Sequence, residues 1–408
     1  MNRLAFGALW LLVFTIPWEN SLVLGGLGTI ARAIGMLAAG LTVLAVLARG
    51  RLRRPEGFHR LVAALVLWVT ASAFWSIEPP LTAARIGTMV QLGAMVWMLW
   101  ELGREEGSAP ALMEAYVWGA WVGVLGTFHS YLFDRSAYDL RYVAAGFDPN
   151  DLGLTLCLAV PMAWTLGTAQ AGRLRRALLL LYVPAAAVAV LLTASRGSFL
   201  SMAVALSIVP WSMPRVGWKL RAACGLLLVA GILGVQTWVP TTSWDRLATI
   251  GSELGQQSVG NRVEVWRRGL ERFADSPVLG VGAGAFGEGI LAGYGRAAVA
   301  HNLWVGVLAE LGLVGFALLA AILLAVLGRV RALAPVERRM WLVLLATWGV
   351  GTMALSWQAR KPTWLLLGLA PVHAAALRAS RREAELDLET ESDPELAGGD
   401  PRPAPQPA

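Results

Sequence analysis

Apolar runs alternate with short polar connections along almost the whole chain. We count about twelve runs of roughly 16 to 27 residues, each long enough to cross a bilayer core of about 30 Å. The runs begin near Leu4, Leu22, Phe58, Leu81, Ala111, Leu152, Ala177, Ser198, Trp218, Asn302, Trp341 and Thr363, and the first and the eighth are short. This pattern predicts an all-α polytopic membrane protein, a bundle of about twelve transmembrane helices.

One long break divides the pattern. We expect transmembrane helices 1–9 in residues 1–239, an extramembrane segment in residues 240–300 and helices 10–12 in residues 301–382. Residues 383–408 carry eight acidic residues and several prolines, a composition that predicts a disordered tail. The break is therefore where the chemistry of such a protein is expected.

The break contains a helical pattern of its own. Val263, Trp266, Leu270 and Phe273 recur at helical spacing, and most of the charged residues lie elsewhere on the wheel. This spacing predicts an amphipathic helix that lies on the membrane or over the bundle.

Charge gives the orientation. The chain is 56% hydrophobic and 15% charged, with a net charge of +7, and its basic clusters recur in alternate connections. Because inner loops collect Lys and Arg, both termini are predicted to be cytoplasmic and residues 240–300 to lie outside. The opposite topology would put nearly every cluster on the wrong side. The basic surface suits anionic lipid head groups and requires no nucleic acid.

Arginines on the outer side run against this bias. Arg196 follows Ser195 at the predicted tip of a helical hairpin, where Ser195 can cap the next helix and Gly197 permits a tight turn. Arg262 stands at the predicted first turn of the amphipathic helix, and Arg141 precedes another turn. Guanidinium groups converging there would suit a diphosphate, because each can bind phosphate oxygens bidentately. A snorkelling arginine or a solvated basic helix face is the alternative.

His301 is the best-placed candidate base. It stands where the outer segment meets the tenth run, and a neutral imidazole can accept a hydroxyl proton near pH 7. The alternative is a histidine that only caps the helix beginning at Asn302. Gly282, Gly284 and Gly287 form a GxGxxG pattern, but no strand precedes it, so a flexible loop that lets a substrate approach is expected.

Metal chemistry is not predicted. The outer connections hold no Asp-x-Asp, and Asp148, Asn150 and Asp151 are explained at least as well by a turn with a helix cap. Cys157 and Cys224 both fall within predicted spans, which indicates neither a disulfide nor a thiolate site. We expect no metal and no cofactor.

Three motifs together resemble those of the O-antigen ligase and O-antigen polymerase superfamily. They are the SRG tripeptide at the hairpin, Arg-x-x-x-Trp in NRVEVWRRGLERFADSP, and HN-x7-E-x-G in HNLWVGVLAELG. WSIEPPLTAARI and GFDPNDLGLTL look like weaker motifs of that superfamily, so the resemblance extends from about Trp75 to Gly315. The order of these motifs, the spacing between them and the side of the membrane on which they are predicted to lie all agree with that superfamily.

The resemblance implies an inverting glycosyltransferase of the GT-C type in the bacterial inner membrane, with its active site in the periplasm. Its donor would be an undecaprenyl-diphosphate-linked glycan, and its acceptor lipid A-core or a second lipid-linked glycan. By this resemblance Arg196 and Arg262 would hold the diphosphate and His301 would activate the acceptor hydroxyl. Arg141, Arg267 and Asn302 are further residues expected to bind substrate.

Three alternatives remain at this stage. A polymerase needs the same donor site and base as a ligase, and a slight preference for ligase rests on the single compact outer segment. A lipid-linked glycan transporter or flippase would also have about twelve spans, but would be expected to bury charges within them. A non-catalytic membrane scaffold would need neither His301 nor the arginines.

Overall fold

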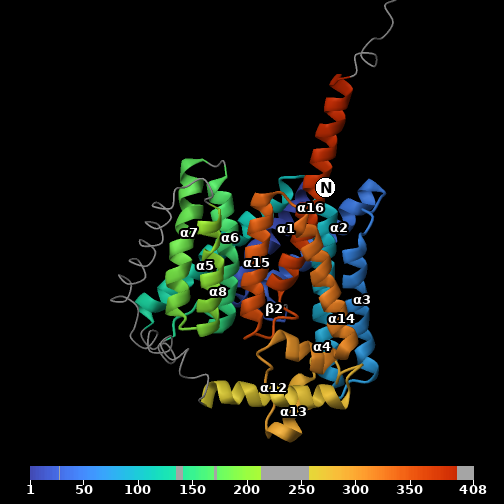
Figure 1. The fold of residues 1–408 in the computed structure, drawn as a ribbon, viewed down its shortest axis with the longest axis vertical. Coiled ribbons are helices and arrows are strands. Elements are labelled where there is room, and N and C mark those ends of the chain that lie inside the picture. The colour runs from blue at the N-terminus through green and yellow to red at the C-terminus, as the bar shows by residue number, and fades with distance from the viewer. Residues whose placement is uncertain (27, 135–140, 170–171, 213–256, 393–408) are drawn as a thin grey trace, which may run out of the picture.

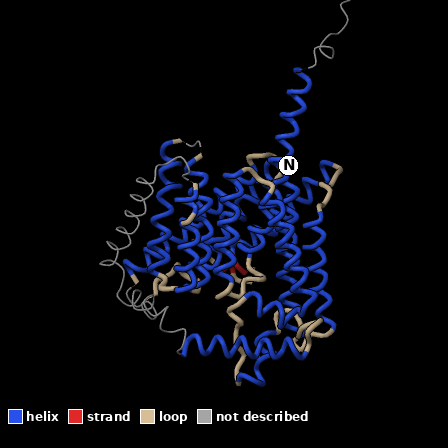
Figure 2. The backbone as a smooth tube through the Cα atoms, viewed as in Figure 1, coloured by secondary structure: helices blue, strands red, loops and turns tan. Residues whose placement is uncertain are grey.

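The computed structural model describes the chain except for residues 27, 135–140, 170–171, 213–256 and 393–408, and its described part is a helical bundle (Figures 1 and 2). The helices are α1 (Asn2–Thr15), α2 (Ile30–Arg49), α3 (Gly57–Ala71), α4 (Pro79–Leu102), α5 (Ser108–Phe133), α6 (Pro149–Thr168), α7 (Arg173–Leu192), α8 (Arg196–Leu206), α9 (Ile208–Trp211), α12 (Gln257–Asp275), α13 (Phe286–Tyr294), α14 (Leu303–Arg331), α15 (Pro335–Thr352) and α16 (Lys361–Ser392). Two 3₁₀ helices, η1 (Ile16–Ser21) and η2 (Ser72–Phe74), and the antiparallel strands β1 (Val23–Leu24) and β2 (Gly28–Thr29) complete the described elements.

The helices follow the apolar runs closely. A helix matches every predicted run except the one near Trp218, which lies outside the described residues, although α2 starts late because a β-hairpin occupies Val23 to Thr29. Six helical segments in the described part are long and apolar enough to cross a membrane: Ile30–Arg49, Gly57–Phe74, Ser108–Phe133, Pro149–Thr168, Arg173–Leu192 and Leu303–Arg331. The structure is that of a helical membrane protein, and the count of twelve spans stays a prediction.

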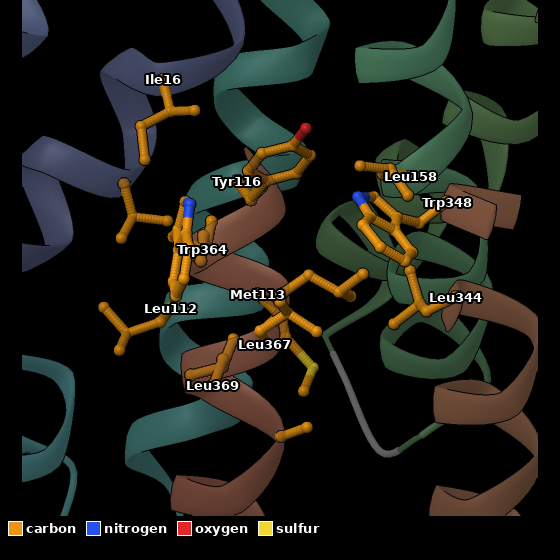
Figure 3. Packing of buried hydrophobic residues seen from close by; sticks show 14 of the residues in the cluster. Ile16, Leu112, Met113, Tyr116, Leu158, Leu344, Trp348, Trp364, Leu367 and Leu369 are labelled. Carbon is orange, nitrogen blue, oxygen red and sulfur yellow. The ribbon is translucent and has the colours of Figure 1, made fainter. Parts of the chain in front are cut away.

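Helix α15 joins two groups of helices. The first group is α5 to α8, the second is α1 to α4 with α14 and α16, and α15 packs against α6 and α8 on one side and α14 and α16 on the other (Figure 1). Aromatic side chains fill the space between them, including Tyr116, Trp348 and Trp364 (Figure 3). Their polar atoms are satisfied, since Trp348 Nε1 donates to Thr363 Oγ1 at 2.9 Å and the Tyr116 hydroxyl donates to the Thr155 carbonyl at 3.1 Å.

Helix α12 lies across one end of the bundle, against α13 and α14 (Figure 1). An amphipathic helix thus lies over the end of the bundle, and its buried stripe differs from the predicted one. Val263 and Leu270 are 50% and 46% exposed, whereas Val265 is buried and Trp266 Nε1 donates to the Ala300 carbonyl at 2.8 Å. The predicted position of the buried face of α12 was wrong because Gly269, which has no side chain to mark it as apolar, lies on the packed face.

A break in α14 ties this end of the bundle together. Gly312 has φ 64°, and the carbonyl of Val278 lies where its Cβ would be. Leu313 N–H donates to the Pro277 carbonyl at 2.8 Å, and Gly282 N–H donates to the Glu310 carbonyl at 3.0 Å. The glycine-rich loop is therefore packed against α14, where the sequence predicted a flexible loop.

An ionic cluster closes the opposite end. The buried Glu101 carboxylate accepts from Arg49 at 2.8 Å, from Arg104 at 2.9 Å and from the Arg53 backbone at 2.6 Å. Helix α16 continues beyond the bundle at this end as far as Ser392 (Figure 1). Residues 383–392 are thus helical where the sequence predicted a disordered tail, because Glu, Leu and Ala make up most of this stretch and favour a helix once α16 has nucleated it.

Candidate functional site

Helices α6, α8 and α15 meet closely at the α12 end of the bundle. Gly153 of α6 faces Ser198 of α8, whose hydroxyl would lie 2.2 Å from an added Cβ. Gly351 of α15 faces Leu154 in the same way, at 2.4 Å. These close contacts bring the ends of three helices together, and the polar residues just beyond them form the site.

Asn150 organises the polar residues at this junction. Its side-chain oxygen accepts from Ser195 Oγ at 2.7 Å and from Arg141 Nη2 at 3.4 Å. Arg141 Nε also donates to the Thr193 carbonyl at 3.0 Å, which fixes the base of the guanidinium beside the α7–α8 turn. Ser195 caps α8 as predicted, since its hydroxyl accepts from Ser198 N–H at 3.3 Å.

A cavity of about 510 Å³ opens at this point, and three arginines line it. Arg141 comes from the segment before α6, Arg196 is the first residue of α8 and Arg262 belongs to α12. Gly351 of α15 and Ala354 and Leu355 just after this helix also line the cavity. Burial lowers the pKa of Arg262, the charge of Arg196 lowers it further, and Asp148 opposes the change. A cavity lined by three arginine side chains favours an anion.

His301 stands beside this cavity, directly before α14. Burial lowers the pKa of His301 below its usual 6.5, the charge of Arg262 adds to this, and Asp148 and Asp151 oppose it. The ring has no hydrogen bond or ion pair within the described residues. An uncharged, unpaired imidazole next to an anion site is in the right state to accept a proton at neutral pH.

The backbone is strained on both sides of the cavity. Among the described residues other than glycine, Ala194 and His301 have positive φ, at 50° and 45°. Gly197, expected to permit the turn, instead leaves room for Ala354, whose Cβ would lie 3.2 Å from an added Cβ. Residues in this region of φ concentrate at functional sites, because the surrounding fold must hold them there.

The connection between α15 and α16, residues 353–360, is held by Asp151. One carboxylate oxygen of Asp151 accepts from the buried Trp357 Nε1 at 2.8 Å, and the other accepts from Arg360 at 2.7 Å. Asn302 Nδ2 donates to the Met353 carbonyl at 3.2 Å, so the segment carrying His301 is tied to the same connection.

Two predicted substrate ligands have structural contacts. Arg267 is exposed and pairs with Glu264 and Glu271, each at 2.7 Å, and it is not part of the lining of the cavity. Asn302 caps α14, with its side-chain oxygen accepting from Trp304 N–H at 2.9 Å and from Val305 N–H at 3.1 Å. Substrate binding by either residue is a proposal only.

Sequence reasoning missed the parts played by Asn150 and Asp151. Asp148 caps α6 as predicted, accepting from Asn150 N–H at 2.8 Å. The next residues, however, reach out of the turn to contact α8 and the α15–α16 connection. The sequence held a signal for this second role. One capping residue is enough to start a helix, so the two polar residues that follow Asp148 were available for contacts with other elements.

Residues 180–320 match the family model described as O-antigen ligase, a little over a third of the chain. This match includes Arg196, Arg262 and His301, and it supports the resemblance found in the motifs. A search of curated proteins returned no match.

Removing the Asp151 carboxylate should destabilise the fold. Asp151→Ala leaves the buried Trp357 N–H without an acceptor, which costs about 1–3 kcal/mol, whereas Asp151→Asn keeps an acceptor and should cost less. Thermal unfolding of the purified protein, followed by tryptophan fluorescence, measures the difference. The control is Asp275→Ala, which removes an exposed pair with Arg272 and should change the melting temperature little. Equal melting temperatures for the two alanine variants would contradict the role of Asp151.

Proposed function

We propose that this chain, whose residues 180–320 carry the O-antigen ligase domain, is an inverting, metal-independent glycosyltransferase. It would move a glycan from undecaprenyl diphosphate to a hydroxyl of lipid A-core. The domain match supports an O-antigen ligase or polymerase type of glycosyltransferase and a membrane location; the donor, the acceptor and the metal independence are parts of the proposal.

The observation that carries the proposal is the convergence of Arg141, Arg196 and Arg262 on one cavity beside His301. The three arginines come from separate segments, so their meeting is a property of the fold. A diphosphate offers several anionic oxygens to such a cluster, and guanidinium groups bind them with paired donors. His301 then lies at the edge of the anion site, where a second substrate could meet the first.

The chemistry follows from these positions. The acceptor hydroxyl oxygen attacks the anomeric carbon from the face opposite the diphosphate, and its proton passes to His301. The bond between the anomeric carbon and the phosphate oxygen breaks, and the diphosphate departs with the electron pair. The arginines stabilise the negative charge that builds on the leaving group, while the sugar carries oxocarbenium character.

The membrane orientation is part of the same proposal. The end opposite α12 carries Arg49, Arg53 and Arg104 around Glu101, and Arg329 at the end of α14. Basic residues collect on the cytoplasmic side of bacterial inner-membrane proteins. The cavity would therefore face the periplasm, with both termini in the cytoplasm.

Transfer by the purified protein tests the function directly. In vesicles containing undecaprenyl-diphosphate glycan and lipid A-core, we expect glycan on lipid A-core, in the presence of EDTA as in its absence. His301→Ala should lower the rate by about 10²–10⁴-fold, the usual contribution of a general base. The control is His129→Ala, which removes an exposed histidine near the C-terminal end of α5 that does not line the arginine cavity.

Three results would contradict this. Unchanged turnover of His301→Ala excludes it as the base, and a loss in EDTA that only a divalent ion restores excludes the metal-free mechanism. Glycan transferred to a second lipid-linked repeat, with none on lipid A-core, would identify a polymerase.

Lysine should not replace the arginines of the cavity. Arg196→Lys and Arg262→Lys keep the charge but lose the second donor to phosphate, so the affinity for the donor should fall roughly tenfold or more. Titration with undecaprenyl diphosphate measures this, and Arg296→Lys, on an exposed residue after α13, is the matched control. Wild-type affinity in both cavity variants would rule out their role.

The pH dependence should differ between free and donor-bound protein. The base form of His301 is required, and because its pKa is lowered in the free protein, the acid limb of kcat/KM for the donor should lie below pH 6.5. A bound diphosphate opposes the charge of Arg262 and raises the pKa of His301, so the acid limb of kcat should lie at higher pH. Rate profiles between pH 4.5 and 8 would show it. Coinciding limbs would argue against His301 as the titrating group.

A further inference from the structure

A second cavity lies on the other side of the α15–α16 connection. Its volume is about 630 Å³, and Ser356, Ala359, Arg360 and Lys361 form the wall that it shares with this connection. Gly351, Ala354 and Leu355 line the arginine cavity described above. The two cavities are thus separated by one short stretch of chain, and the segment before His301 contributes Val299 to the second.

The second cavity is a groove that runs along the bundle. Its lining on α4 extends from Leu81 to Met98, about 26 Å at the helical rise of 1.5 Å per residue and so close to the depth of a bilayer core. On α2 the groove passes Gly35 and Ala39, whose small side chains leave it open. Met36 of α2 is 51% exposed and Leu81 of α4 is 45% exposed, so the groove is open through the side of the bundle.

The floor of the groove is apolar and deformable. Leu92, Met95 and Met98 of α4 line it along with Leu12 of α1. Methionine side chains adapt to irregular apolar ligands because they are unbranched and polarisable. The floor therefore suits acyl chains, which enter from the lipid phase without crossing water.

The rim of the groove is cationic. Arg32 at the start of α2 and Arg85 in the second turn of α4 line it, and neither has an ion pair or hydrogen bond within the described residues. Lys361 pairs with Glu19, and Arg360 pairs with Asp151. The buried Ser356 hydroxyl also lacks a partner in the described part of the chain. Two unpaired arginines and a free hydroxyl above an apolar floor match an acylated lipid with a phosphorylated head group.

We propose that the groove between α2 and α4 binds the acceptor, a phosphorylated lipid with several acyl chains, and presents its head group to His301 from the side opposite the diphosphate. This rests on the proposed function, which assigns the arginine cavity to the donor. The donor diphosphate and the acceptor then approach the α15–α16 connection from its two sides. Such a placement suits an inverting transfer, in which attack and departure occur on opposite faces of the sugar.

Binding of bis-phosphorylated, hexa-acylated lipid A to the full-length protein in detergent, followed by native mass spectrometry, tests the groove. Gly35→Leu fills the groove and should weaken lipid A binding at least tenfold, while undecaprenyl diphosphate still binds. Gly40→Leu is the matched control, since it adds the same side chain to α2 where nothing lies within 4 Å. The double variant Arg32→Gln, Arg85→Gln should weaken lipid A binding about tenfold and abolish the preference for phosphorylated over dephosphorylated lipid A.

Several outcomes would overturn the proposal. Lipid A that binds Gly35→Leu as tightly as wild type, or dephosphorylated lipid A that binds wild type equally well, excludes this groove as its site. Loss of undecaprenyl diphosphate binding in Gly35→Leu would assign the groove to the donor. Displacement of lipid A by equimolar phosphatidylglycerol would make it a site for bulk lipid. Because binding is measured without turnover, a protein that binds lipid A here but transfers nothing would refute the proposed function alone.

Discussion

The two hydrogen bonds accepted by Asp151 fix the connection on which both cavities depend. Trp357 is buried and Arg360 is half exposed, so one carboxylate satisfies an indole inside the bundle and a guanidinium at its surface. An unsatisfied indole N–H in this position would be costly, which makes the arrangement close to obligatory once Trp357 is packed. Asp151 belongs to the first turn of α6, and the same turn holds Asn150, the acceptor for Arg141 and Ser195. The first turn of α6 therefore positions both the α15–α16 connection, which borders the arginine cavity, and the side chain of Arg141, which lines it.

Features that depend on neighbouring residues could be predicted from the sequence. Ser195 and Asp148 cap helices where Ser and Asp precede apolar runs, and α12 forms where apolar residues recur at helical spacing. The burial of Gly269 in place of Leu270 could not be predicted, because glycine carries no apolar signal. Nor could the meeting of Arg141 with Arg262, since their separation in space depends on how α6, α8 and α12 pack. The roles predicted for Arg196, Arg262 and His301 came from the resemblance of motifs, because the local sequence pattern alone left structural roles open for each of them.

The groove between α2 and α4 had no sequence signal at all. Gly35 and Ala39 look like ordinary small residues of a transmembrane helix, and Arg32 and Arg85 look like charges at the ends of spans. Only the packing of α2 along α1, which leaves a gap toward α4, turns them into the wall and rim of a cavity. The strain at Ala194 and His301 is equally invisible in the sequence. Each costs roughly 1–3 kcal/mol, and the surrounding hydrogen bonds and helix ends must hold both residues in place.

The bend of α14 at Gly312 makes Arg262 and His301 parts of one closed ring. From Arg262 the chain follows α12 to Pro277, whose carbonyl is bonded to Leu313, and α14 leads back from there to His301; Trp266 closes the ring through Ala300. Arg141 and Arg196 stand outside this ring, in the segment before α6 and at the start of α8. The spacing of Arg262 and His301 is consequently set within this ring, whereas the width of the arginine cavity depends also on how α12 lies relative to the segments that carry Arg141 and Arg196. A change in the packing of α6 or α8 would therefore alter the width of the cavity more than the spacing between the base and the Arg262 guanidinium.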